Sequence, residues 1–310
     1  MSVPSAPDVD RFWREGYLRL SRVFSADEIA TLRDVVAKKL ATREELFGTL
    51  PSGVRHLRSD LLADPDARAI LLDGRVLAVA RALLGGSLVY FGDSTLQVGT
   101  GERGWHRDNR LPDRFDPSGL DWDGRYPLIR FGLYLQDHAR HSGGLGIRVG
   151  SHLWQRAPGR PIPPSSGLWS KIRRRRVVRS ARTFGRPIFV DTEVGDLAIW
   201  TLRTTHSGNS VRLRALPRLR LPPRVEELCP RWLAVPESES RMAFFFTLAA
   251  VHPHTERYVE YLATRDYAVE MWRRSKYDDA ARDACARAGV ALREVDPAKL
   301  PRGAATSARA

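Results

Sequence analysis

Cysteine is scarce in this chain of 310 residues, which contains only Cys229 and Cys285. Two cysteines cannot form the framework of several disulfides that holds a small secreted domain together. They also exclude a zinc site built from thiolates alone. Covalent cross-links and zinc–thiolate centres therefore play no part in the fold expected from this sequence.

Long hydrophobic runs are missing as well. The longest apolar stretch, Met242 to Val251, is too short to cross a bilayer. The N-terminal sequence MSVPSAPDVDRFW has no basic region followed by an apolar one, so no secretory signal is visible. Hydrophobic residues make up 43% of the chain and charged residues 28%, which is typical of a globular protein with a sizeable core. We expect a cytoplasmic protein with no membrane partner.

Lysine is rare among the basic residues: five of the 50 are Lys and the other 45 are Arg, and the net charge is +14. Such a charge suggests a nucleic-acid partner. The arginines are, however, spread along the whole chain, as a GC-rich coding sequence would produce. Only the run Lys171 to Arg176 is concentrated. It can bind phosphates or an acidic or carrier-bound substrate, but a solvated cluster is the simpler interpretation, and we expect no nucleic-acid partner.

The first 86 residues have mostly helical patterns. A short helix, Asp10 to Glu15, precedes a brief strand, Tyr17 to Leu20. Ser25 and Glu28 have the spacing of a capping box, in which each side chain accepts a hydrogen bond from a free backbone amide of the helix that follows. A further helix is expected from Arg75 to Leu84, where two glycines end it.

Residues 87–250 instead contain short β-like runs without helical crossovers, followed by helical patterns in residues 251–310. This order favours a single domain over residues 1–310, mainly β with helical flanks, arranged as a sandwich or jelly roll. Three long irregular segments, 99–127, 154–187 and 207–240, interrupt the β region and are expected to be lids or binding loops. The best strand candidates are Leu88–Val98, Leu128–Gln136, Leu145–Val149, Leu197–Leu202 and Met242–Leu248.

The sequence WHRD contains His106 and Asp108 two residues apart. On an extended chain, residues i and i+2 face the same side, so an imidazole and a carboxylate can point into one cavity. These are two of the three ligands of the 2-His-1-carboxylate metal site. A histidine beside an aspartate at the surface is the alternative, because so short a motif also arises by chance.

A second histidine stands where a third ligand is needed. The segment GDLAIW reads as a tight turn into a buried strand, and His206 follows it among small polar residues. A histidine just beyond an apolar strand is well placed to enter a pocket. His106, Asp108 and His206 are therefore the candidate metal ligands.

Four segments together resemble the phytanoyl-CoA dioxygenase family of the Fe(II)/2-oxoglutarate-dependent oxygenases. They are FWREGYLRLSRVFSADEIATLR, WHRDN, LIRFGLYLQDHARHSGGLGIRVGSH and GDLAIW with TTHSGNS, and they span roughly residues 11 to 250. The resemblance implies a double-stranded β-helix (a cupin-like jelly roll) and an iron held by His106, Asp108 and His206. It also implies 2-oxoglutarate and O₂ as co-substrates and C–H oxidation, by default hydroxylation, of a small-molecule substrate such as a natural-product intermediate.

The family clamps the far carboxylate of 2-oxoglutarate with an arginine soon after the distal histidine. The strand that this arginine opens comes here only after an apparent insertion, which points to Arg241, with Arg212 as the second candidate. Gln97, on the strand before WHRD, is a further candidate for binding the co-substrate. The chain departs from the family pattern at Val149, in place of a proline, and at Gly132, where a bulky aromatic is missing and extra room is expected.

Other histidines have simpler interpretations. His254 and Glu256 form a second H-x-E pair, but the start of a helix is the expected role of this segment. His152 is expected to be structural too, while His138 and His141 are expected in solvated loops. Two other functions stay open: a nucleic-acid-binding protein on a β scaffold, and a cupin-like metalloenzyme that does not use 2-oxoglutarate.

Overall fold

The structure is a computed structural model that describes residues 4–50, 53–99, 104–108, 125–138, 140–154, 184–217, 219, 221, 225–226, 228–230, 232–236 and 241–296. No helix within these ranges is both long and apolar enough to cross a membrane. The α-helices are α1 Ala6–Glu15, α2 Ala26–Thr42, α3 Pro65–Leu71, α4 Gly74–Leu84, α7 Pro253–Leu262, α8 Asp266–Arg274 and α9 Asp279–Arg287. The strands are β1 Tyr17–Leu20, β2 Phe47–Thr49, β3 Arg55–Leu57, β4 Leu88–Tyr90, β5 Ser94–Val98, β6 Leu128–Tyr134, β7 Gly144–Val149, β8 Arg186–Val190, β9 Leu197–Thr201, β10 His206–Ser210, β11 Met242–Ala250 and β12 Val290–Leu292.

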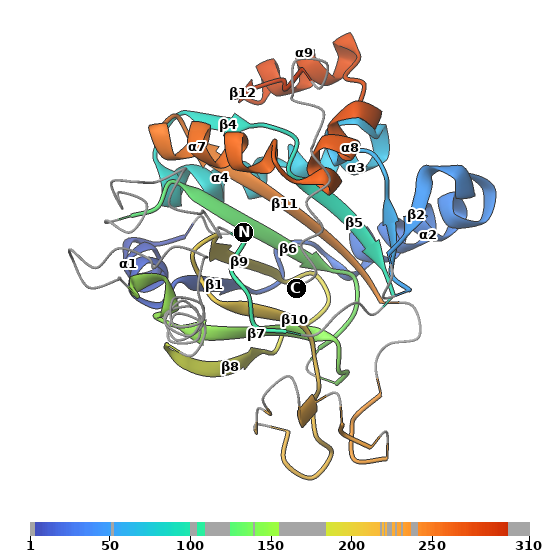
Figure 1. The fold of residues 1–310 in the computed structure, drawn as a ribbon, viewed down its shortest axis with the longest axis vertical. Helices are drawn as coiled ribbons and strands as arrows, with labels where there is room; N and C mark the ends of the chain where they lie inside the picture. Colours follow the sequence, from blue (N-terminus) through green and yellow to red (C-terminus); the bar gives the residue numbers. More distant parts are fainter. Residues whose placement is uncertain are drawn as a thin grey trace, which may run out of the picture.

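Two sheets make up the β core (Figure 1). The large sheet has the strand order β1-β9-β6-β11-β5-β3-β2, with β4 attached to β11 and β12 to β4. The small sheet has the order β10-β7-β8. All of these pairings are antiparallel except that of β12 with β4. The expected jelly-roll class, mainly β with helical flanks, is confirmed.

The central strand β11 shows how the sequence divides the large sheet into two faces. Phe244, Phe246 and Leu248 are buried in the main hydrophobic core, together with residues of α2, α3 and α4. The alternate residues Ala243 and Phe245 belong to a separate cluster shared with β7 and β8. Because side chains alternate along a strand, one face of the sheet carries α2, α3 and α4, and the other faces the small sheet and, around Ala249, helices α7 and α8.

The helices at the N-terminal end form where the sequence signals place them. Ser25 accepts a hydrogen bond from the Glu28 amide, and the Glu28 carboxylate accepts one from the Ser25 amide, so the predicted capping box of α2 is present. Helix α4 ends at Gly85, as expected. The short helix α3 shows no strong helical repeat of apolar residues in its sequence. Packing of its buried face against the rest of the protein stabilises it.

Several strand boundaries differ from the sequence expectation. The run Leu88–Val98 is two strands, because the chain turns at Gly92, where the Trp272 indole N–H donates to the Gly92 carbonyl at 2.9 Å. The supposed loops 154–187 and 207–240 overlap strands β8 and β10, respectively. Both pair with β7, and those long-range hydrogen bonds cannot be read from local sequence.

The turn before β9 anchors the start of the chain to the large sheet. Asp196 is fully buried and accepts hydrogen bonds from Arg19 Nε at 2.6 Å and from the backbone amide of Arg22 at 2.9 Å. Gly195 has φ +87°, and its carbonyl accepts a hydrogen bond from the Phe24 amide at 3.0 Å. A Cβ at Gly195 would lie 2.1 Å from the Phe24 carbonyl oxygen, so only glycine fits.

His138 is buried, which overturns the expectation of a solvated loop residue. Its backbone amide donates to the Thr192 carbonyl at 2.7 Å, and its Nδ1 lies 3.0 Å from Thr192 Oγ1. Its Nε2 lies 3.2 Å from the amide nitrogen of Gln136, which can only donate. Burial, and after it the charges of Arg241, His141 and Arg212, lowers the pKa of His138 to about 3. The ring is therefore a neutral, packed part of the core.

We expect Gly195→Ala to lower the free energy of unfolding by more than about 2 kcal/mol, because it combines a left-handed conformation with a backbone clash. The matched control is Gly74→Ala at the start of α4, where a Cβ meets nothing within 4 Å. The control should change stability by less than about 1 kcal/mol. Urea unfolding of both variants measures the difference, and equal stabilities would contradict the role of the turn.

Protonation of His138 should destabilise the fold in acid. The pKa of His138 is lower in the folded state than in the unfolded chain, so its stabilising contribution is complete above about pH 6.5 and is lost as the pH falls toward 3. Between pH 7 and pH 5 the wild type should lose about 2 kcal/mol more stability than His138→Gln. Urea unfolding of both proteins at the two pH values tests this, and parallel losses would contradict a neutral His138.

Candidate functional site

His106 and His206 lie side by side at the edge of the small sheet. The His106 amide donates to the His206 carbonyl at 2.8 Å, and the His206 amide donates to the His106 carbonyl at the same distance. This reciprocal pair adds His106 to the free edge of β10, so that two residues far apart in the sequence share one register. Their ring centroids are 4.3 Å apart.

Asp108 completes the predicted group. One carboxylate oxygen, Oδ1, lies 3.8 Å from His106 Nε2, and the other, Oδ2, lies 3.7 Å from His206 Nε2. The three possible ligand atoms all lie within 4.8 Å of one another, and no other group of three such residues converges within the described ranges. The structure therefore brings together the three side chains that the sequence selected.

The hydrogen bonds of both imidazoles leave Nε2 facing the carboxylate. His106 Nδ1 lies 2.9 Å from the Gly104 carbonyl, and His206 Nδ1 lies 3.1 Å from the Thr204 carbonyl. A carbonyl only accepts hydrogen bonds, so Nδ1 of each ring donates a proton to it, and Nε2 is the nitrogen that faces the carboxylate. Metal-binding histidines are oriented in this way by their second nitrogen.

Asp108 is held in its charged form. Burial by itself would raise its pKa, but the charges of His206, Arg130 and His106 outweigh this and lower the pKa below its usual range. Asp108 Oδ2 is buried and has no hydrogen-bond partner among the described residues. Two imidazoles that present Nε2, together with a carboxylate that has an unsatisfied buried oxygen, fit a divalent cation of the iron type.

Aromatic side chains close one side of this group. The Trp200 ring lies 5.2 Å from the His206 ring, between centroids. A Cβ on Gly132 would lie 3.0 Å from Trp200 Cζ3 and 3.3 Å from Phe245 Cε1. The extra room expected at Gly132 is therefore absent, because Trp200 and Phe245 from the two neighbouring strands fill it.

Arg241 immediately precedes β11, and its side chain is buried. Its Nε donates to the Gly143 carbonyl and its Nη1 to the Gly99 carbonyl, both at 2.9 Å. The guanidinium carbon lies 5.8 Å from the centre of the Tyr134 ring. By strand alternation Arg241 falls on the same face as Phe245, the face that contains the metal-ligand candidates.

Arg212 and Gln97 lie in different surroundings. Arg212 forms an ion pair with Asp191 through Nη2, which also donates to the His138 carbonyl at 2.6 Å. A carboxylate already binds this guanidinium. Gln97 is half-buried on β5, opposite Ala243 of β11, on the face of the sheet toward the small sheet.

Sequence reasoning did not select Arg130, which lies near Asp108, or Asp93 and Thr247, which contact Arg130. Arg130 Nη1 is 3.2 Å from Asp93 Oδ2, and Arg130 Nε is 4.0 Å from Asp108 Oδ2. Thr247 donates from Oγ1 to Asp93 Oδ2 at 2.7 Å. The available signal was a single charged residue in the middle of the apolar strand LIRFGLY.

His152, His252 and His254 have structural roles. His152 is buried, with Nε2 2.8 Å from the Trp13 carbonyl, which agrees with the structural interpretation. His252 Nδ1 accepts a hydrogen bond from the His254 amide at the start of α7. Glu256 forms an ion pair with Arg293 at 2.7 Å instead of joining a second metal site.

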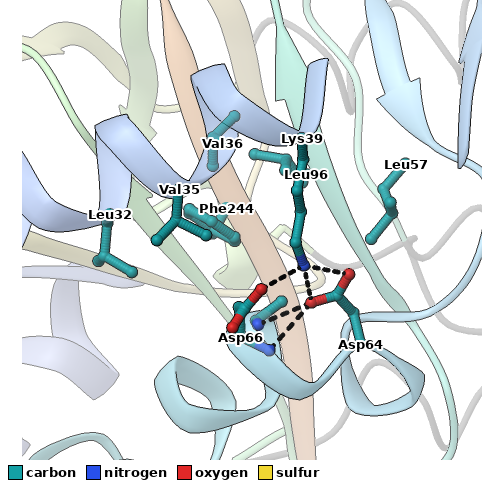
Figure 2. A pocket seen from close by; sticks show the side chains of 10 residues that line it. Leu32, Val35, Val36, Lys39, Leu57, Asp64, Asp66, Leu96 and Phe244 are labelled. Atoms are coloured by element: carbon teal, nitrogen blue, oxygen red, sulfur yellow. Dashed lines mark hydrogen bonds and ion pairs between the residues drawn. The ribbon is translucent and has the colours of Figure 1, made fainter. Parts of the chain in front are cut away.

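A small hollow exists on the opposite face of the large sheet (Figure 2). Apolar side chains of α2, β5 and β11 line it, and Lys39 Nζ reaches across it to Asp64 and, at 2.8 Å, to Asp66. The helix-covered core separates this hollow from His106, Asp108 and His206. It is part of the packing of α2 and α3, and the run Lys171 to Arg176 lies outside the described residues.

Comparison with known proteins identifies a matching family and two similar curated proteins. The profile described as Phytanoyl-CoA dioxygenase (PhyH) matches residues 12–212. A curated relative, the ectoine dioxygenase of Sphingopyxis alaskensis, is 30% identical over 160 residues, which are 48% of this chain and 50% of that protein. The ectoine dioxygenase of Stutzerimonas stutzeri is also 30% identical, over 161 residues, or 46% of this chain and 49% of that protein. The chain thus matches about half the length of these curated relatives.

Solved structures agree on the fold. The crystal structure of EctD from S. alaskensis with 2-oxoglutarate and 5-hydroxyectoine has a TM-score of 0.53 at 20% identity, covering 80% of this chain and 76% of that one. The α-ketoglutarate-dependent carbocyclase SnoK from nogalamycin biosynthesis has a TM-score of 0.53 at 17% identity, covering 79% and 84%. The family profile extends over more than half of the sequence, and this chain belongs to the phytanoyl-CoA dioxygenase family.

Proposed function

We propose that this protein is a non-haem Fe(II)- and 2-oxoglutarate-dependent oxygenase that oxidises a C–H bond of a small molecule, most simply by hydroxylation. The observation that carries the proposal is the convergence of His106, Asp108 and His206, whose ligand atoms lie within 4.8 Å of one another. These residues would hold Fe(II) on one side and leave three coordination positions for 2-oxoglutarate and O₂. When bound, iron would couple the oxidative decarboxylation of 2-oxoglutarate to succinate and CO₂ with transfer of one oxygen atom of O₂ to the substrate.

The protein's own residues would prepare the three ligands. The Gly104 and Thr204 carbonyls each accept a hydrogen bond from Nδ1, and this directs both Nε2 atoms toward the metal position. The lowered pKa of Asp108, which results when nearby positive charges outweigh its burial, supplies an anionic ligand at neutral pH. Little rearrangement is then needed when the metal arrives.

Arg241 would bind the far carboxylate of 2-oxoglutarate. Its hydrogen bonds to the Gly143 and Gly99 carbonyls fix the plane of the guanidinium on the same side of the sheet as the metal ligands. A permanently charged, planar group suits a carboxylate. Arg212 is the weaker candidate because Asp191 already pairs with it. Gln97, on the neighbouring strand, would add a hydrogen bond to the co-substrate.

A small molecule is the proposed substrate. The curated relatives are named ectoine dioxygenases, and one structural neighbour contains 5-hydroxyectoine. Neighbours named as an epimerase and a carbocyclase show that this fold also hosts other outcomes. The basic run Lys171 to Arg176 would favour a substrate that carries negative charge, such as a phosphate-bearing or carrier-bound molecule.

The decisive experiment adds Fe(II) and then 2-oxoglutarate to the apo-protein without oxygen and records the visible spectrum. A weak charge-transfer band that needs both additions would support the proposal. Iron binding without a band would favour a cupin-like metalloenzyme that does not use 2-oxoglutarate. No iron binding would contradict the proposed enzyme.

Removal of either histidine should remove the metal. Because each supplies one of three protein ligands, His106→Ala and His206→Ala should each weaken Fe(II) binding by more than about 100-fold. Circular dichroism should show that both variants are folded. The control His141→Ala, which alters a histidine outside the cluster, should bind iron like the wild type. Full iron binding by both triad variants would disprove the assignment.

Arg241→Ala should raise the 2-oxoglutarate concentration needed for half-maximal charge-transfer absorption by about 10- to 100-fold, the effect of losing a charged hydrogen-bond partner. Arg212→Ala is the matched comparison and should change that concentration by less than about threefold. The opposite ranking would assign the co-substrate carboxylate to Arg212. Thermal unfolding of both variants checks that the carbonyl contacts of Arg241 are not the cause.

A further inference from the structure

We infer that Arg107 is a positioning residue for the metal site: its side chain fixes the register between the segment of His106 and that of His206. The inference rests on the proposed function, because it concerns the same metal. Among the described residues, segment 104–108 meets β10 in a single bridge, between His106 and His206. One bridge holds a strand weakly, and a slip of one residue would turn a ligand to the opposite face.

Arg107 lies directly beside this bridge, on the face away from the candidate ligands. His106 and Asp108 point to one side of the extended segment, so Arg107 between them points to the other. In an antiparallel pair centred on His106 and His206, the residue opposite Arg107 is Thr205. Arg107 Nε donates to Thr205 Oγ1 at 3.0 Å. This hydrogen bond joins the chain neighbours of two candidate ligands across the strands.

Thr205 is a fixed point of attachment. It is fully buried, and its amide donates to Ser151 Oγ at 2.8 Å. Its carbonyl accepts a hydrogen bond from the Arg148 amide at 2.9 Å, and Arg148 belongs to β7, the central strand of the small sheet. Because both backbone groups of Thr205 are bound, its hydroxyl has a defined position toward Arg107.

The guanidinium of Arg107 reaches a second acceptor with another of its nitrogens. Nη2 donates to the Ser151 carbonyl at 2.5 Å, and the guanidinium carbon lies 5.5 Å from the centre of the Trp154 ring. Arg107 is 7% exposed, and a buried charge needs such hydrogen bonds to offset its loss of water. Two N–H groups of one rigid plane, directed at two fixed acceptors, define where Arg107 lies. The ligands on either side of it are placed at the same time.

Three substitutions separate this contact from charge and from packing. Arg107→Lys keeps the positive charge but lacks the planar group that reaches both acceptors. Thr205→Val removes the hydroxyl and keeps a β-branched side chain, whereas Thr205→Ser keeps the hydroxyl. The matched control is Arg68→Lys on α3, which lies over the opposite face of the large sheet. The Arg68 side chain is 11% exposed, and its Nε also donates to a backbone carbonyl, that of Leu62, at 2.9 Å.

The measurements are NMR-detected amide hydrogen exchange of His106 and His206 in the metal-free protein, and Fe(II) affinity without oxygen. Arg107→Lys and Thr205→Val should each speed exchange of the two amides by about tenfold or more, because a hydrogen bond to a charged group no longer supports the bridge. Each should also weaken Fe(II) binding by about 10- to 100-fold. The amides of β11 should exchange as in the wild type. Thr205→Ser and Arg68→Lys should match the wild type in both measurements.

The variant that combines Arg107→Lys with Thr205→Val tests whether the two side chains act through one contact. It should bind Fe(II) no more weakly than Arg107→Lys alone, because that variant already lacks the contact. Losses that multiply would overturn the inference.

Wild-type exchange and wild-type Fe(II) affinity in both Arg107→Lys and Thr205→Val would also overturn it. So would an equal acceleration of the β11 amides, which would mean a general loss of stability instead of a local opening. If the wild type binds no Fe(II), the proposed function fails, whereas exchange of the two histidine amides in the metal-free protein still decides the role of Arg107.

Discussion

The reciprocal backbone hydrogen bonds between His106 and His206 are the interaction on which the site depends. They fix two residues from distant parts of the chain in one antiparallel register, with ring centroids 4.3 Å apart. Asp108 then follows His106 on the same side of an extended segment and faces both Nε2 atoms. A shift of one residue in this register would turn one imidazole to the opposite face. The metal-ligand candidates therefore converge because the edge of β10 is paired.

The two faces of the large sheet have different surroundings. On one face Phe244, Phe246 and Leu248 pack against helices, and the Lys39–Asp64 ion pair lies in that layer. On the other face, polar and aromatic groups lie near the candidate ligands, with Arg130 and Trp200 at paired positions of β6 and β9. Successive residues of one strand point to opposite faces. The strands that carry the candidate ligands and their neighbours are therefore held in place by packing against the helices on the other face.

Several buried polar groups help to specify a single arrangement of the fold. Asp196 accepts hydrogen bonds from one side chain and two backbone amides around a turn that only Gly195 permits. Burial keeps His138 neutral, and Gln136 and Thr192 match one tautomer of its ring. Arg130 is bound between two carboxylates. Each of these groups would be costly to bury without partners, so each one selects a single arrangement of the surrounding strands.

The sequence by itself determined the family, the jelly-roll class, the capped helix α2 and the trio His106, Asp108 and His206, because these follow from short spacings and from motifs in a recognisable order. Tertiary structure alone decided where strands β8 and β10 pair, that His138 is buried, and that Trp200 and Phe245 fill the space over Gly132. It also distinguished the surroundings of Arg241 from those of Arg212 and placed Arg130 beside Asp108. The physical reason is that periodicity reports which face of an element is apolar, whereas burial, ion pairs and strand register depend on contacts between residues far apart in the chain.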